Sequence, residues 1–149
     1  MDTLDRKILS VLQGNARASL QEIGQAVGLS SSPCWERIRK MEQSGVIEGY
    51  TVRLNARALG LHDTVLVQVT LDSHSDNTLE KFGETLAAIP EVVEAYLVSG
   101  EYDYLLRVAV KDTRDYERLL RERLYKIKGI RHSKSSFVLR TLKKADLPL

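Results

Sequence analysis

The sequence predicts an α+β protein of two parts: an N-terminal helical unit that ends in a short β-ribbon, and a C-terminal antiparallel sheet covered by helices. Two observations support this fold class. Residues 1–60 contain three short segments with apolar side chains at helical spacing, whereas residues 61–149 alternate between strand and helix periodicity. The strand–helix–strand pattern of the second part also occurs twice. We therefore expect two domains, residues 1–60 and residues 61–149.

The composition is that of an ordinary globular chain. Hydrophobic residues make up 43% and charged residues 28% of the 149 residues, and the net charge is +2. The basic excess lies after Pro33, and such local clustering indicates an anionic partner better than net charge does. The start "MDTLDRKIL" does not resemble a signal peptide, and no apolar run approaches the ~18 residues of a membrane helix. We expect a cytoplasmic protein without a membrane partner.

The first two predicted helices each combine an apolar face with a capping residue. Asp2 or Thr3 can cap the first helix, with Asp5 in its first turn. The apolar face of this helix comprises Leu4, Ile8, Leu9, Val11 and Leu12. The segment "SLQE" at 19–22 is a capping box that begins the second helix, and Gly28 ends it. The buried face expected for the second helix comprises Leu20, Ile23, Ala26 and Val27.

The third helix follows directly after Gly28. Ser30 or Ser32 can cap it, and Pro33 fits its first turn because the missing N–H costs nothing there. Its inward face comprises Cys34, Ile38 and Met41, at positions i, i+4 and i+7. The only cysteine of the chain is therefore expected to be an inert core residue.

The segment "VIEGYTVRLN" at 46–55 alternates apolar and polar side chains and predicts a short two-stranded ribbon. Two short helices joined by a glycine turn form a helix-turn-helix, and a ribbon after them makes it the winged variety.

The outward face of the third helix is suited to DNA, because the second helix of such a pair enters the major groove. Arg39 can pair with guanine, whereas Arg37 and Lys40 are better placed for phosphates. Trp35 is as readily a half-buried structural residue as a base or sugar contact. The candidate DNA-binding residues are Ser30, Ser31, Ser32, Pro33, Trp35, Glu36, Arg37, Arg39 and Lys40. A charged helix face alone is ordinarily just solvated, so the interpretation depends on the whole 60-residue pattern.

The second part has the strand and helix order β-α-β-β-α-β of a ferredoxin-like domain. Strands are expected at 64–71, 92–98, 104–110 and 133–142, and helices at 75–90, capped by Ser75 or Asp76, and at 113–127. Right-handed crossovers put both helices on one face of the sheet. The other face carries apolar side chains too, which predicts sheet-against-sheet homodimerisation. A two-fold dimer would present two recognition helices to DNA.

The segment "VSGEYDYLLRV" at 98–108 is the strongest candidate for ligand chemistry. Gly100 permits close backbone approach, so neighbouring N–H groups can receive a carboxylate, and Asp103 can pair with an ammonium group. Together these would bind a free α-amino acid. The alternative is an ordinary hairpin turn that uses Asp and Gly for its backbone conformation.

No catalytic or metal site is visible in the sequence. The carboxylates Glu101 and Asp103 have no nucleophile, base or metal to complete a hydrolytic site. His62, His74 and His132 lie far apart and lack Cys or carboxylate partners at ligand spacing. We expect neither an enzyme nor a bound metal or cofactor.

Four stretches carry a resemblance to a known family: "LDRKIL", "LQGNARASLQEIGQAVGLSSSPCWERIRKMEQSGVIEGY", "GEYDYLLRV" and "SSFVL". Over essentially its full length the chain resembles the Lrp/AsnC (leucine-responsive, feast/famine) transcriptional regulators. The resemblance implies a winged helix-turn-helix joined to a ligand-sensing, oligomerising (RAM) domain. It also implies homodimers that assemble into octamers as tetramers of dimers, in a bacterial or archaeal cytoplasm, associated with the nucleoid. Small-molecule effectors, usually amino acids, would bind between sensing domains and alter DNA affinity.

The resemblance also assigns residues. It places the recognition helix from Ser30 to about Gln43. The effector contacts that it implies are Tyr96, Val98, Gly100, Glu101, Tyr102, Asp103, Ser135, Ser136 and Phe137. Two alternatives stand beside a regulator: an enzyme built on the ferredoxin-like domain, for which no catalytic constellation is visible, and a protein that compacts the nucleoid.

Overall fold

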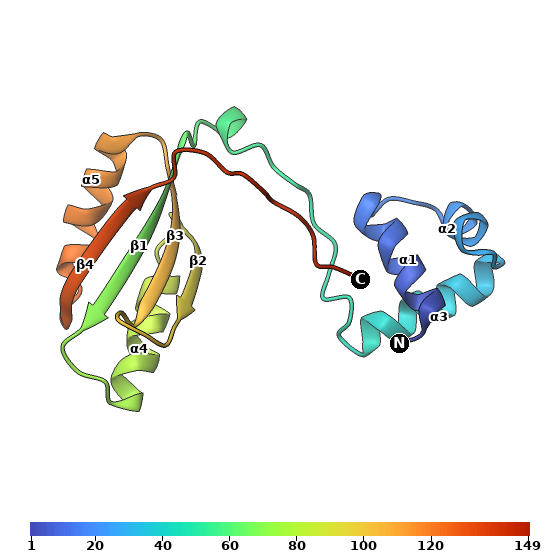
Figure 1. The fold of residues 1–149 in the computed structure, drawn as a ribbon, viewed down its shortest axis with the longest axis horizontal. Coiled ribbons are helices and arrows are strands. Elements are labelled where there is room, and N and C mark those ends of the chain that lie inside the picture. Colours follow the sequence, from blue (N-terminus) through green and yellow to red (C-terminus); the bar gives the residue numbers. More distant parts are fainter. The chain divides into compact units, whose positions relative to one another are not determined.

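A computed structural model describes residues 1–149, with the side chain of Asp76 outside the description. The chain forms two compact units, one of residues 1–54 with 143–149 and one of residues 55–142 (Figure 1). This division differs from the predicted domains at two places. Residues 55–60 belong to the second unit, and the C-terminal residues pack with the first, where Gln13 Nε2 donates to the Leu147 carbonyl (3.1 Å).

The first unit contains the three predicted helices, α1 (Thr3–Gly14), α2 (Leu20–Val27) and α3 (Ser31–Gln43). Asp2 and Ser19 are N-caps and form complete capping boxes with Asp5 and Glu22, as predicted. Ser30 is the N-cap residue of α3, although its side chain makes no capping hydrogen bond. The buried core of this unit comprises Ile8, Ile23, Val27, Cys34, Ile38 and Met41.

The buried face of α2 differs from the prediction. Ala26 is exposed, whereas Gly24 is buried. A Cβ on Gly24 would lie only 2.4 Å from the carbonyl oxygen of Leu29, because the turn into α3 passes directly over α2 at this point. Helical spacing places both residues beside the face formed by Ile23 and Val27, and only the path of the turn selects between them.

The predicted ribbon is wrong as a secondary-structure assignment: residues 46–55 form no strand within the described chain. The Tyr50, Val52 and Leu54 side chains are 52%, 74% and 69% exposed. Alternation favours a strand only when a partner strand covers it, and a lone two-stranded ribbon is marginally stable in water. The Tyr50 hydroxyl instead donates to Glu42 Oε1 (2.8 Å), which ties the segment to the end of α3.

The second unit is a four-stranded antiparallel sheet with two helices. The strands are β1 (Asp63–Leu71), β2 (Val92–Leu97), β3 (Tyr104–Val110) and β4 (Ile130–Phe137), in the spatial order β2-β3-β1-β4. The helices are α4 (Asp76–Ala87) and α5 (Thr113–Glu122), with short 3-10 turns η1 (Arg57–Leu59) and η2 (Leu124–Lys126) (Figure 1). This order and the β-α-β-β-α-β sequence confirm the ferredoxin-like fold.

Both helices pack on the same face of the sheet. Alternate residues of β1 and β3 are fully buried against them, and the shared core comprises Val65, Val67, Val69, Leu71, Phe82, Leu86, Ile89, Tyr104, Leu106, Val108, Val110, Tyr116, Leu119 and Leu124. Ser75 is the N-cap residue of α4 without a capping hydrogen bond from its side chain, and the alternative cap Asp76 lies outside the described side chains.

The last strand begins and ends earlier than the predicted range 133–142. It starts at Ile130, which pairs with Leu71, and the register shifts by one residue at Arg131 of β4 before His132 pairs with Thr70. It ends at Phe137, which pairs with Val65. Beyond that point only the Val138 N–H reaches β1, at the Thr64 carbonyl (2.9 Å), because β1 itself begins at Asp63. A strand cannot continue past its partner's end without leaving backbone groups unpaired.

Candidate DNA interface and effector site

The outward face of α3 gathers most of the predicted DNA-binding residues on one exposed surface. Pro33 and Arg37 are half-buried, and the exposed members are Ser30, Ser31, Ser32, Trp35, Glu36, Arg39 and Lys40. The helix presents this surface because Cys34, Ile38 and Met41 fix its opposite face in the core, as predicted. The serines lie at the helix N-terminus, where backbone N–H groups favour anions.

Arg37, a predicted phosphate contact, forms ion pairs within the helical unit. Its NH1 group donates to Asp2 Oδ2 and to Asp5 Oδ1, both at 2.7 Å. The same two carboxylates form the capping box of α1, so the guanidinium joins the start of α1 to α3. The backbone N–H groups of the capping box, and then Arg37, hold the pKa of both Asp2 and Asp5 below the ordinary value. These contacts give Arg37 a structural role in the helical unit, and its phosphate contact stays a prediction.

Replacing Arg37 with alanine is expected to lower the stability of the helical unit in a pH-dependent way. The pKa of Asp2 and of Asp5 is lower in the folded state than the unfolded-state value of 3.8. Ionisation of these carboxylates therefore stabilises the fold fully above pH 3.8, and this stabilisation is lost as the pH falls through the folded-state pKa. The difference in unfolding free energy between wild type and variant should therefore be largest near neutral pH and shrink below pH 3.8. Urea unfolding at several pH values measures it. Arg39→Ala serves as the matched control, and a pH-independent difference for Arg37→Ala would contradict the ion-pair account.

Arg39 and Trp35 form a pair on the exposed surface. The guanidinium carbon of Arg39 lies 5.1 Å from the centroid of the Trp35 ring, within the range of a cation–π contact. The Trp35 side chain is 48% exposed. It is therefore not a core residue, although it packs against its neighbour on the helix.

The loop of the predicted effector site is held by Asp103. Its Oδ2 accepts from the Leu71 N–H (2.7 Å), and its Oδ1 lies 3.0 Å from Nε2 of His74. Its own N–H donates to the Val69 carbonyl (2.9 Å), so the carboxylate and backbone both attach the loop to the end of β1. Gly100, with φ of +134°, adopts a conformation that favours glycine. Of these groups, Oδ1 is the one that a ligand could share with the exposed His74.

The other predicted effector residues do not converge on one pocket within a single chain. Tyr96 lies on β2 and Phe137 on β4, and these are the two edges of the sheet, roughly 14 Å apart at ~4.8 Å per strand. Ser135 and Phe137 both contact Tyr116. The hydroxyl oxygens of Ser135 and Tyr116 are 2.5 Å apart, and the centroids of the Phe137 and Tyr116 rings lie 5.4 Å apart in an edge-to-face arrangement. Glu101 and Ser136 are exposed, and Val98 and Tyr102 are half-buried.

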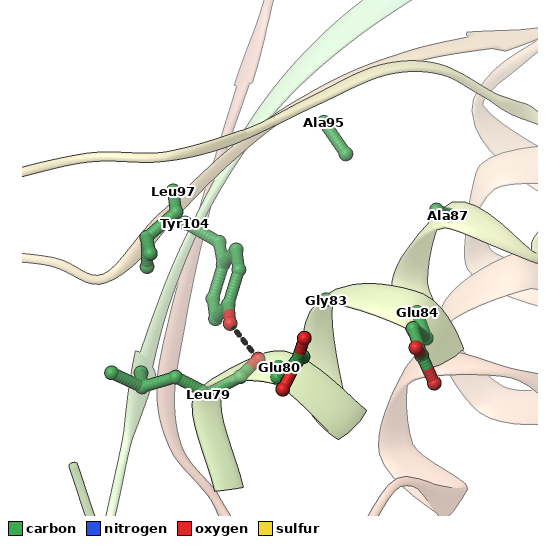
Figure 2. A pocket seen from close by; sticks show the side chains of 8 residues that line it. All are labelled: Leu79, Glu80, Gly83, Glu84, Ala87, Ala95, Leu97 and Tyr104. Atoms are coloured by element: carbon green, nitrogen blue, oxygen red, sulfur yellow. Dashed lines mark hydrogen bonds between the residues drawn. The ribbon is translucent and has the colours of Figure 1, made fainter. Parts of the chain in front are cut away.

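A groove of about 510 Å³ lies elsewhere, between α4 and β2 (Figure 2). It is lined by Leu79, Glu80, Gly83, Glu84, Ala87, Ala95, Leu97 and Tyr104. Tyr104 crosses beneath it and donates its hydroxyl hydrogen to the Leu79 carbonyl. Strand alternation explains why the predicted effector residues are not among the lining: Ala95 and Leu97 point to the helices, whereas Tyr96 points to the other face. Sequence reasoning missed this groove, since no motif marks it.

Among the described residues, no cluster of three or more His, Cys, Asp or Glu side chains is arranged to hold a metal ion. No helix in that part of the chain has the length and apolar character needed to cross a bilayer.

The fold and the exposed face of α3 define a class: a helix-turn-helix DNA-binding unit joined to a ferredoxin-like domain. Residues 1–48 match the winged helix-turn-helix DNA-binding family, and residues 64–148 match the Lrp/AsnC ligand binding domain. The chain belongs to the Lrp/AsnC family of transcriptional regulators, which confirms the resemblance and the winged helix-turn-helix class.

Individual relatives agree along the full chain. The leucine-responsive regulatory protein of Escherichia coli is 37% identical over 98% of this chain and 89% of its own length. An AsnC family transcriptional regulator from Agrobacterium tumefaciens is 41% identical, with a TM-score of 0.94 over 99% of this chain and 97% of that chain. A transcriptional regulator from Neisseria meningitidis, solved in complex with L-Met, is 32% identical, with a TM-score of 0.93 over 99% of this chain and 96% of that chain.

Proposed function

We propose that the chain is a sequence-specific DNA-binding regulator of transcription whose DNA affinity responds to a bound amino acid, and that it acts by binding, without catalysis or a cofactor. The main support is the exposed face of α3, which presents serines, Arg39 and Lys40 while the opposite face packs into the helix-turn-helix core. Such a helix reads base edges while nearby cations position it on phosphates. We place this activity in the cytoplasm, on the nucleoid.

Selection of bound duplexes from randomised DNA, followed by titration at increasing salt, tests the DNA-binding part. A sequence-specific regulator should enrich one motif and keep its preference for that motif as salt weakens all complexes. Loss of all preference at moderate salt would contradict it. Broad, regularly spaced protection over long DNA would instead favour a protein that compacts the nucleoid.

The effector part of the proposal has its own support. The similar regulator from Neisseria meningitidis was solved with L-Met. In this chain an α-ammonium group could pair with Asp103 Oδ1, and the backbone around Gly100 could receive the α-carboxylate. Because Tyr96 and Phe137 lie on opposite edges of one sheet, we infer that a complete pocket needs residues from more than one chain.

A melting-temperature screen of the twenty amino acids tests for the effector. A ligand that binds only the folded state adds about 2.7 kcal/mol of stability when its concentration is 100 times Kd. That is a rise of roughly 10 °C or more for a domain of this size. L-methionine and similar apolar amino acids are expected to give the largest rise. No rise with any of the twenty would contradict the amino-acid proposal.

We further propose that the chain forms a homodimer through the sheet face opposite the helices, and that dimers assemble into octamers. Leu66, Leu105 and Tyr96 lie on this face. Arg107 also lies there, bound to Glu94 through two hydrogen bonds of 2.8 Å. Gln68 of β1 and Lys134 of β4 pair on the same side, so the face combines apolar side chains with polar groups and an ion pair, a mixture typical of protein interfaces.

Replacing Leu105 with glutamate is expected to prevent dimer formation. Leu105 is half-buried on the open face, so the single chain tolerates the change, but a dimer would have to bury two new charges near its centre. Light scattering after size-exclusion chromatography should show the mass of one chain, against a multiple for wild type. The control is Lys81→Glu on α4, which is exposed on the helix side. An unchanged mass for Leu105→Glu would place the interface elsewhere.

A further inference from the structure

The three cations of the "ERIRK" segment in α3 are held in three different ways. Arg37 is fixed by Asp2 and Asp5. Arg39 lies over the ring of Trp35, and Lys40 is exposed. In the described part of the chain, no ion pair involves Arg39 or Lys40. Arg37 therefore already uses N–H donors in ion pairs. Arg39 contacts an aromatic ring but forms no ion pair within the described chain, and Lys40 is exposed to solvent.

The kind of contact decides what each arginine can still do. A carboxylate holds a guanidinium by accepting from its N–H groups, as at Arg37, and so uses the donors that would read a base. An aromatic face attracts the positive charge without accepting those N–H groups in the same way. The fork of N–H donors on Arg39 stays available while the long side chain has lost part of its freedom.

We propose that Trp35 is a positioning residue for base recognition: its ring holds Arg39 ready to pair with O6 and N7 of a guanine in the major groove. This inference rests on the proposed DNA-binding function and deepens it. It gives Trp35 a third role beside the two that the sequence left open, a half-buried structural residue and a base or sugar contact. The ring is 48% exposed and lies beside the cation, while Cys34 and Ile38 hold the helix inward. A preorganised side chain loses less freedom on binding than a free one does.

A double-mutant cycle on a duplex selected by the wild-type protein tests the coupling. Arg39→Ala is expected to weaken binding about tenfold or more and to relax the preference at one guanine. Trp35→Ala should weaken binding about fivefold and relax the same position, because part of the Arg39 contact is lost. The double variant should bind within about twofold of Arg39→Ala alone. Trp35→Phe, which keeps an aromatic face, should restore most of the affinity. Lys40→Ala is the contrast variant and should weaken all sequences alike.

A second readout needs no DNA. Trp35 is the only tryptophan in the chain, so its fluorescence reports this contact directly. Arg39→Ala should expose the ring and increase quenching by acrylamide, whereas Lys40→Ala should leave quenching unchanged. Melting curves of every variant establish that each one is folded before it is compared.

Two outcomes would overturn the inference. If Trp35→Ala weakens binding by the same factor with and without the Arg39 side chain, the tryptophan contacts DNA independently. If Arg39→Ala leaves acrylamide quenching unchanged, the pair is not formed in solution. A wild-type protein that selects no motif at all would instead overturn the DNA-binding function on which the inference rests. The quenching comparison would still test the Trp35–Arg39 contact in that case.

Discussion

Gly24→Ala is expected to destabilise the helical unit by about 1–3 kcal/mol, the range observed when a well-packed core is overfilled. The new methyl group would lie 2.4 Å from the Leu29 carbonyl oxygen, which is backbone and cannot rotate away. Alanine normally favours a helix over glycine by about 1 kcal/mol, so a net loss would show that the close contact dominates. Urea unfolding followed by Trp35 fluorescence measures it, because the only tryptophan reports on this unit.

Gly14→Ala is the matched control for this substitution. Gly14 is the last residue of α1 in the same unit, and a Cβ there meets nothing within 4 Å. It should be neutral or slightly stabilising. A Gly24→Ala variant as stable as Gly14→Ala would contradict the close crossing of the turn over α2. Because Leu29 and Ser30 lead directly into α3, the Gly24 variant should also bind DNA more weakly.

Asp103→Ala is expected to abolish the response to amino acids and to loosen the loop after β2. The substitution removes the acceptor of the Leu71 N–H bond and the partner of His74. A hydrogen bond to a charged group contributes about 1.5–3 kcal/mol, so the second unit should lose stability of that order. DNA binding without effector should be unchanged, since α3 lies in the other unit. Melting temperature and DNA affinity, each with and without the effector, measure both effects.

Two further variants separate the structural role of Asp103 from its role toward a ligand. Asp103→Asn keeps an acceptor for the Leu71 N–H but removes the charge, so it should retain most of the stability and still lose the effector response. His74→Ala leaves the Leu71 bond intact and frees Oδ1, so the response should persist or strengthen. An effector response that survives in Asp103→Asn would rule out the ammonium contact.

The sequence predicted the features that depend only on neighbouring residues, namely the helix caps and the side chains that a strand buries. The capping boxes at Asp2 and Ser19 formed because each N-cap side chain and its N3 carboxylate lie three residues apart in any helix that begins there. Alternation in β1 predicted which side chains would be buried, and Val65, Val67 and Val69 are fully buried. These signals need only the period of the element, and the sequence contains it.

Signals that depend on tertiary contacts could not be obtained from the sequence in the same way. The ion pairs of Arg37 depend on two carboxylates at the start of α1, more than thirty residues away in the sequence. The helical spacing within α3 does not predict that contact. Gly24 is buried only because the following turn crosses it. The prediction of a ribbon at 46–55 was wrong for a related reason. Alternation indicates which side chains share a face, but it does not indicate whether a partner strand exists.

The candidate effector site was only partly predictable. Gly100 lies in the predicted turn with a positive φ, and Asp103 already holds that loop to β1 in a single chain. The remaining residues come from β2 and β4, which the strand order β2-β3-β1-β4 puts at the two edges of the sheet, so one chain does not bring them together. Assembly of the site is therefore a matter of how chains associate, which a single chain cannot specify.

The binding of Arg39→Ala to a duplex selected by the wild-type protein tests the central claim, that the exposed face of α3 reads DNA. The account predicts a loss of roughly 1–3 kcal/mol on the selected duplex, a smaller loss on unrelated DNA, and a relaxed preference at a single guanine. Equal weakening on every sequence, with the preference at each position intact, would contradict base reading by Arg39.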